Sequence, residues 1–173
     1  MHRSIVTFVC MVSAVASLKA NDLASLDVTP FPGWNGPQAV WSGPRQEAFM
    51  AVNSQTEWNA LWQTLFPTHV EPHGEAPYVD FSRFTMLVAA LGARPGGGYS
   101  VVIQHARDDG ATVRISVLEV RPGKGCAETA LVTYPISIVL IPRTDRPVHF
   151  ERDVEDFNCN EVRPFHEFEL SSN

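Results

Sequence analysis

From residue 84 onward, short apolar segments alternate with turn residues, and this pattern restricts the chain to a β-rich fold. Phe84 to Leu91 is a nearly continuous apolar run, which predicts a strand in the middle of a sheet. A glycine-rich connection leads to a second strand, Tyr99 to Ala106. Asp108-Asp109-Gly110 is a sharp turn signal, and apolar and polar residues then alternate through Thr112–Val120. Strands joined by such short turns are expected to pair antiparallel.

Further strands are expected on both sides of this region. Ala130 to Ile141 is a long strand with a bend at Pro135, and Val148–Glu151 and Pro164–Leu170 are short final strands. Gln46 to Val52 alternates in the same way and predicts a first strand. The count is six or seven strands with no internal repeat.

One segment has the pattern of a helix. Ser54 and Glu57 form a capping box, in which each side chain bonds a backbone N–H group at the start of the helix. The next residues place an apolar stripe on one face at helical spacing: Trp58, Leu61, Trp62 and Leu65. Pro67 ends the helix, and the two tryptophans are expected to pack in the core.

These elements predict an α+β, mainly β fold, an antiparallel sheet folded as a sandwich or roll with one packed helix. The chain has 173 residues, 45% of them hydrophobic and 18% charged, which suits one compact domain. We assign residues 46–173 to that domain. Residues 21–45 are a Pro/Gly-rich lead-in, mostly irregular, with packing through its aromatic residues Phe31, Trp34 and Trp41.

The first twenty residues have the layout of a secretory signal peptide. A basic start, Met1-His2-Arg3, precedes the apolar run Ile5–Val12 and small residues, and cleavage is expected after Ala16 or Ala20. The alternative is a buried N-terminal helix. No later segment has 18 consecutive apolar residues, so we expect a secreted or periplasmic protein without membrane insertion after cleavage.

The charge of the chain argues against nucleic acid as a partner. The net charge is −6, and removal of Arg3 and Lys19 with the signal peptide changes it from 13 − 19 to 11 − 19, or −8. Lys and Arg form no cluster in the remainder. An acidic chain of this kind is not expected to bind nucleic acid or an anionic membrane.

Cleavage would leave Cys126 and Cys159, an even pair. In an oxidising compartment such a pair predicts a disulfide, which would contribute about 3–4 kcal/mol of stability. Two separate buried thiols are the alternative. Without a CxxC motif, a redox or metal pair is not favoured.

Residues 80–150 resemble a known family. The resemblance rests on Asp80-Phe81, Leu91-Gly92, Arg94-Pro95-Gly96-Gly97-Gly98-Tyr99-Ser100-Val101-Val102-Ile103, Glu119, Pro122-Gly123, Thr133-Tyr134-Pro135 and Ile141-Pro142-Arg143. These motifs are similar to the PrcB C-terminal domain, named after a subunit that stabilises a bacterial surface protease complex. With the helix before it, the likeness extends over residues 46–151. It implies a small exported accessory module, and it brings no catalytic residues with it.

The glycine-rich loop is the candidate binding site, formed by Arg94, Gly96, Gly97, Gly98 and Tyr99. Glycines permit positive φ and close approach of another backbone, so the loop has the properties to hold an anion or a partner peptide. It matches neither the P-loop nor the dinucleotide motif. The simpler interpretation is a bulged hairpin connection whose tyrosine packs on the sheet.

Residues 69–75 are a weak metal candidate, with His69, His73 and two nearby glutamates. Zinc or copper accepts such ligands, but prolines break the segment and no helix presets the ligand distances. We therefore interpret it as a solvated loop and expect no cofactor.

The sequence offers no recognisable catalytic centre. Ser100, His105 and Asp80 have the residue types of a hydrolytic triad, but no GxSxG elbow surrounds a serine. In a regular strand Ser100 and His105 would point to opposite faces. A carboxylate pair, such as Glu119 with Glu128, stays open because strands can bring distant residues together.

The function expected is therefore that of an exported, non-catalytic accessory or binding domain that engages or stabilises a protease or another exported protein. The alternatives are a metal-binding or small-molecule-binding module and an uncharacterised hydrolase.

Overall fold

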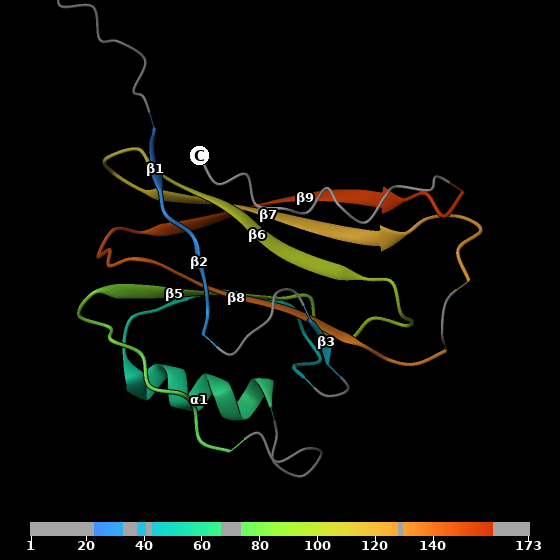
Figure 1. The fold of residues 1–173 in the computed structure, drawn as a ribbon, viewed down its shortest axis with the longest axis horizontal. Coiled ribbons are helices and arrows are strands. Elements are labelled where there is room, and N and C mark those ends of the chain that lie inside the picture. Colours follow the sequence, from blue (N-terminus) through green and yellow to red (C-terminus); the bar gives the residue numbers. More distant parts are fainter. Residues whose placement is uncertain (1–22, 33–37, 41–42, 67–73, 128–129, 161–173) are drawn as a thin grey trace, which may run out of the picture.

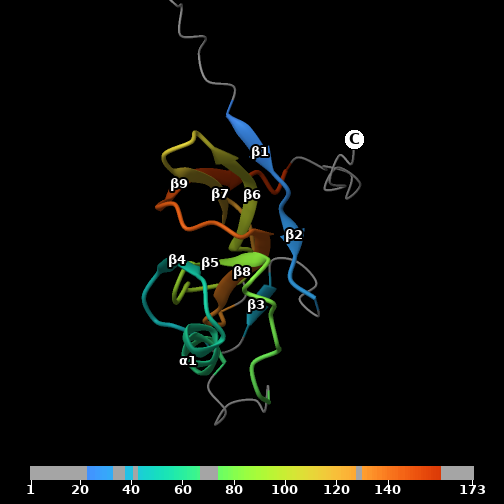
Figure 2. The same ribbon diagram turned by 90° about the vertical axis from the view of Figure 1, so that its left-hand side faces the viewer.

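The computed structural model describes residues 23–32, 38–40, 43–66, 74–127 and 130–160. Two β-sheets are stacked on each other, and a single helix covers the outer face of one of them (Figures 1 and 2). The elements are β1 (Ala24–Leu26), β2 (Thr29–Pro30), β3 (Gln38–Val40), β4 (Ala48–Val52), α1 (Gln55–Leu65), β5 (Phe84–Ala90), β6 (Ser100–Asp108), β7 (Val113–Pro122), β8 (Tyr134–Pro142) and β9 (Val148–Phe157). The prediction of an α+β, mainly β sandwich with one helix is confirmed.

Sheet A has the strand order β1-β6-β7-β9, and sheet B has the order β2-β8-β5-β4, with β3 also paired to β8. All pairs are antiparallel except β7 with β9, which is parallel. The expectation of a wholly antiparallel sheet is therefore wrong for this pair. Between β7 and β9 the chain crosses to sheet B, where it forms β8. It then returns to sheet A as β9, which runs in the same direction as β7.

Sheet B is the middle layer and is covered on both faces. On the helix side its side chains pack with Trp58, Trp62 and Leu65; they are Met86, Val88, Ala90, Ile136, Ile138 and Leu140. On the other side Leu87, Ala89, Leu91, Val139 and Ile141 meet sheet A. Strands buried on both faces cannot alternate between apolar and polar residues, which explains the continuous apolar runs in β5 and β8.

The helix begins and packs as its sequence predicts. Ser54 is the N-cap, and its hydroxyl oxygen accepts a hydrogen bond from the Glu57 N–H at 3.2 Å. Glu57 bonds back to the N–H of Asn53 at 3.1 Å, one residue earlier than a capping box requires. Both tryptophans are buried, and Nε1 of Trp58 donates to the Pro77 carbonyl at 3.0 Å. This bond satisfies the polar end of a buried indole.

The lead-in is more ordered than predicted. Instead of a mostly irregular segment, its described part holds three short strands, of which β1 extends sheet A and β2 and β3 extend sheet B. Phe31 is buried and stacks edge-on against Trp58, with ring centroids 5.6 Å apart. Local sequence did not reveal these strands because they form by pairing with β6 and β8, which lie far away in the chain. Trp34 and Trp41 lie outside the described residues.

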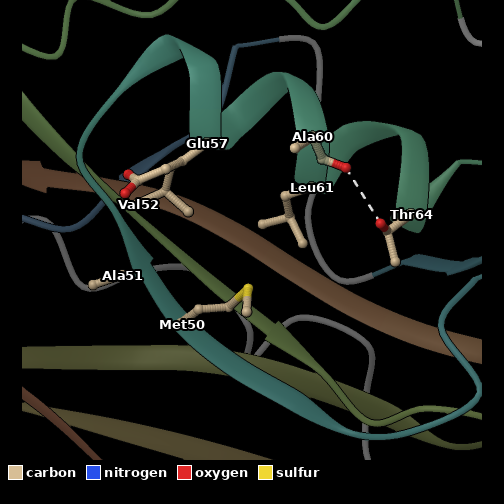
Figure 3. Close-up of a pocket in the computed structure, with 7 residues that line it drawn as sticks. All are labelled: Met50, Ala51, Val52, Glu57, Ala60, Leu61 and Thr64. Atoms are coloured by element: carbon tan, nitrogen blue, oxygen red, sulfur yellow. Dashed lines mark hydrogen bonds between the residues drawn. The ribbon is translucent and has the colours of Figure 1, made fainter.

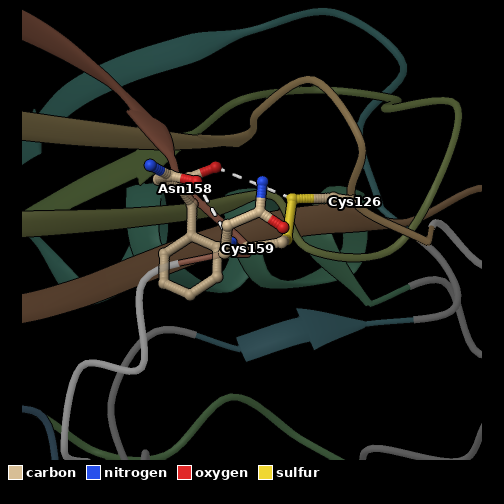
Figure 4. Close-up of a disulfide and its surroundings, with 5 residues drawn as sticks. Cys126, Asn158 and Cys159 are labelled. Atoms are coloured by element: carbon tan, nitrogen blue, oxygen red, sulfur yellow. Dashed lines mark hydrogen bonds between the residues drawn. A yellow bond between two sulfur atoms is a disulfide. The ribbon is translucent and has the colours of Figure 1, made fainter.

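The predicted disulfide joins Cys126 and Cys159, whose Cα atoms are 5.4 Å apart (Figure 4). It connects the turn after β7 to the residues just after β9. Strand β9 has ten residues, whereas the strand predicted from the sequence, Val148–Glu151, has four. Next to the disulfide, the Gly123 N–H donates to the Phe157 carbonyl at 2.8 Å. The disulfide thus holds the last part of β9 against β7, its one partner among the described strands.

Two further predictions fall on residues outside the described part, the signal peptide at 1–20 and the strand Pro164–Leu170. Within the described part, α1 is too short to cross a membrane, and no other helix is present there.

Candidate functional site

The candidate site begins with a buried carboxylate on β7. Val113, Ile115 and Val117 point from β7 into the core between the sheets, and Glu119 is the next residue on that face. Its side chain is fully buried, with 0% exposure. An ionised carboxylate in such a place requires partners of opposite charge.

Three arginines supply that charge, and each comes from a different part of the chain. Arg121 Nε donates to Glu119 Oε1 at 2.8 Å, and Arg94 Nη2 lies 3.4 Å from the same oxygen. Arg152 Nη1, on β9, lies 3.4 Å from Glu119 Oε2. We call these four residues the arginine cluster. It closes one end of the space between the two sheets with charge instead of apolar side chains.

Burial and charge act on Glu119 in opposite directions. Burial raises the pKa of Glu119, while the hydrogen bond from Arg121 and the charges of Arg121, Arg94 and Arg152 lower it. The arginines prevail, so the pKa lies below its ordinary value and the carboxylate is ionised at neutral pH. The hydrogen bond to Glu119 in turn raises the pKa of Arg121. Oε2 of Glu119 accepts no hydrogen bond from the described residues.

Two of the arginines are held by further contacts. Arg94 Nη1 donates to the Leu91 carbonyl at 2.6 Å. Arg152 Nη1 donates to Glu47 at 2.8 Å, and its guanidinium lies 5.8 Å from the centre of the Phe49 ring. Arg121 is the most exposed of the three, with 43% of its side chain accessible. Its guanidinium is therefore the part of the cluster most accessible to solvent.

The predicted binding loop lies directly beside the arginine cluster. Arg94 and Thr133 pair through two backbone hydrogen bonds, of 2.8 and 3.1 Å, and the Thr133 hydroxyl donates to the Gly96 carbonyl at 2.8 Å. Gly98 has a φ of +88°, which favours glycine, and lies against Pro122. The loop is thus a tied connection that leads from β5 in sheet B to β6 in sheet A. The interpretation as a hairpin connection is wrong, because these two strands lie in different sheets and do not pair. The role of the loop in binding stays a prediction.

The five predicted loop residues differ in what they offer to a partner. Gly96 is buried, while Gly97 and Tyr99 are partly exposed and Gly98 is exposed. The residues before Thr133 add apolar surface, since Leu131 is 47% and Val132 51% exposed. We use the name loop face for Tyr99, the three arginines of the cluster and this apolar pair, which the backbone bonds between Arg94 and Thr133 link to the loop.

The structure corrects the expected directions of Ser100 and His105. A β-bulge between Ile103 and His105 shifts the register of β6, so that Ser100 pairs with Val120 and His105 with Ser116. Both partners lie on one face of β7, and cross-strand partners share a face, so Ser100 and His105 do as well. Five residues of strand still separate them by roughly 15 Å, beyond hydrogen-bonding distance.

The metal candidate and the suggested carboxylate pair fall partly on residues outside the described ranges. His69 and His73 of the metal candidate lie outside the described residues, as does Glu128, the suggested partner of Glu119. In the described ranges, no three His, Cys, Asp or Glu side chains gather in a way that could hold a metal ion.

Sequence reasoning missed the arginine cluster as a unit. It named Arg94 and Glu119 separately, and it did not identify Arg121 or Arg152. The available signal was the period of two in β7, which places Glu119 in line with Val113, Ile115 and Val117 on the core face. The parallel pairing that brings Arg152 alongside was not visible in the sequence.

Comparison with known proteins gives one match. Residues 85–142 match the family model described as PrcB C-terminal, which confirms the resemblance seen in the sequence over that segment. The matched segment runs from β5 to the end of β8 and includes the glycine-rich loop, Glu119 and Arg121. No curated protein and no solved structure matched the chain.

Proposed function

Because the chain carries a PrcB C-terminal segment at residues 85–142, we propose that it is an exported, non-catalytic accessory domain that binds another exported protein. A protease is the partner that the family name suggests. In this proposal the domain stabilises or engages its partner and performs no reaction on it.

The observation that carries this proposal is the loop face. Exposed Leu131 and Val132 lie next to Thr133, whose bonds to Arg94 and Gly96 hold the glycine-rich loop in place. Arginine and tyrosine are enriched in protein interfaces, and exposed apolar side chains beside them are typical of such surfaces. A surface already held in shape loses less conformational entropy on binding.

The cysteine pair supports export. Disulfides persist in oxidising compartments, and Cys126 and Cys159 are joined in this fold. The signal-peptide pattern of residues 1–20 supports the same destination.

The positions of the nucleophile candidates support a non-catalytic role. The two described cysteines are oxidised to a disulfide, so neither is a free thiolate. Ser100 and His105 are too far apart along β6 for the histidine to activate the serine. A broad panel of ester and peptide substrates is expected to show no turnover by the purified protein.

Capture of partners from the native exported fraction tests the proposed function. We expect the immobilised protein to retain a specific protein at micromolar concentration. Tyr99→Ala and Leu131→Asp should each weaken that retention at least about tenfold, a loss of about 1.4 kcal/mol. Tyr78→Ala is the matched control, because it removes another tyrosine, 81% exposed, outside the loop face. The proposal would be refuted if the wild type retained no protein, or if the wild type and the three variants retained it equally.

A further inference from the structure

Strand β4 has an unprotected edge. It pairs with β5 on one side, and no described strand pairs with its other side. The other described edge strands are protected: β1 and β3 have three residues each, β2 has two and contains Pro30, and β9 carries Glu151, Asp153, Glu155 and Asp156. Short length, proline and charge are the usual means by which proteins prevent pairing at a sheet edge. The β4 sequence, Ala-Phe-Met-Ala-Val, contains neither a proline nor a charged residue.

A groove of about 430 Å³ runs between this edge and α1 (Figure 3). It is lined by Met50, Ala51, Val52, Glu57, Ala60, Leu61 and Thr64. The side chains of Met50 and Leu61 enter it from the strand and from the helix. Met50 is 39% exposed, and a flexible thioether adapts readily to different apolar side chains. The edge therefore offers backbone hydrogen-bonding groups beside an apolar groove.

The charge that lines the groove is acidic. Glu57 is the one charged residue in its lining, whereas Glu47, directly before β4, is already paired with Arg152 at 2.8 Å. A ligand with a basic residue at one end would match the Glu57 carboxylate. A second copy of the chain would bring a second Glu57 and no compensating cation from its own groove, so self-pairing is disfavoured by like charge.

We propose that β4 receives an extended segment of the partner protein as an added strand. Alternate apolar side chains of that segment would enter the groove between Met50 and Leu61, and a lysine or arginine at one end would face Glu57. Backbone hydrogen bonds provide affinity in this binding mode, and the groove selects the side chains. The inference rests on the proposed binding function, but it uses a surface separate from the loop face.

The first test uses a fluorescent synthetic peptide with valine and threonine alternating between two terminal lysines. Fluorescence anisotropy is expected to show micromolar binding to the full chain, and amide hydrogen exchange should slow across Ala48–Val52. A peptide with glutamate ends should bind at least about tenfold more weakly. Two further peptides carry N-methyl groups, which remove backbone N–H donors, on alternate residues. One is methylated at the odd-numbered residues of the peptide and the other at the even-numbered residues. Only one of these two sets of residues faces β4, so one methylated peptide should lose binding and the other should keep it.

Variants locate the binding on the protein. Met50→Lys and Ala60→Lys place a cation in the groove at exposed positions, and each should weaken binding of the lysine-ended peptide at least about tenfold with little change in melting temperature. Tyr99→Ala, on the loop face, should leave it unchanged.

Four results would overturn the inference: no binding up to about 1 mM peptide, equal binding of both methylated peptides, unchanged binding by Met50→Lys, or a dimer of the chain that Met50→Lys dissociates. If capture of the native partner still depends on Tyr99 in any of these cases, the proposed function stands and this inference alone fails.

Discussion

Arg121 donates a hydrogen bond of 2.8 Å to Glu119, two residues away on the same strand. Residues two apart share a face, and this face of β7 otherwise carries the core residues Val113, Ile115 and Val117. The bond therefore lies where the apolar core between the sheets gives way to charge. The stability of this end of the sandwich should consequently depend on pH.

Glu119→Gln is expected to lower the free energy of unfolding at pH 7 by about 1–3 kcal/mol, because it removes the charge that pairs with three partly exposed arginines. The pKa of Glu119 is lower in the folded state than in the unfolded chain. Its stabilisation is thus complete above the unfolded value, about 4.3, and is lost as the pH falls through the lower folded value. Urea unfolding between pH 7 and pH 3 should show a steeper loss in the wild type than in the variant.

Glu155→Gln, at an exposed carboxylate on β9, serves as the control and should keep the wild-type pH profile. The lowered pKa of Asp109, caused mainly by backbone hydrogen bonds from Ala111 and Thr112, affects all three proteins equally and cancels in the comparison. Identical profiles for wild type and Glu119→Gln would contradict the assignment.

Replacing both Cys126 and Cys159 by serine should lower the free energy of unfolding by about 3–4 kcal/mol, because the bond closes a long loop in the unfolded chain. Hydrogen exchange should increase first at the C-terminal half of β9, for which β7 is the one partner within the described part of the chain. Reduction of the wild type with dithiothreitol is expected to reproduce both effects. A variant as stable as the oxidised wild type would disprove the stabilising role.

Gly92→Ala should destabilise the fold by about 3 kcal/mol or more. Gly92 has a φ of +75°, and a Cβ there would lie 2.8 Å from the Arg45 carbonyl oxygen. Gly110→Ala is the matched control, since Gly110 also has a positive φ, +88°, but has open space around it. It should cost only the conformational strain, about 1–2 kcal/mol. Thermal unfolding of both variants measures the difference, and equal losses would show that the close approach to Arg45 is unimportant.

The mature protein is expected to begin at Ser17 or Asn21, after cleavage by signal peptidase. N-terminal sequencing and intact mass of the protein from its native cells would verify this. Blocking the cleavage site with Ala16→Pro and Ala20→Pro should retain the precursor. An intracellular protein that keeps residues 1–20 would refute export and remove one support of the proposed function.

The sequence by itself determined the helix α1 and the strands β5 to β8. The capping box and apolar stripe placed α1, and the apolar runs and turn residues placed β5 to β8, because such patterns depend on neighbours in the chain. The motifs over residues 80–150 together indicated the resemblance to the PrcB C-terminal domain, and the even cysteine pair predicted the disulfide.

Only the tertiary structure decided which strands lie side by side. The parallel pairing of β7 with β9 brings Arg152 to Glu119, and the connection after β5 brings Arg94 there from 25 residues earlier in the chain. The bulge in β6 turns His105 to the face of Ser100, and β1 to β3 exist only through their partners. Pairing and register depend on contacts between distant segments, and local pattern carries no information about them. The same pairing leaves the second edge of β4 without a partner strand among the residues that the structure describes.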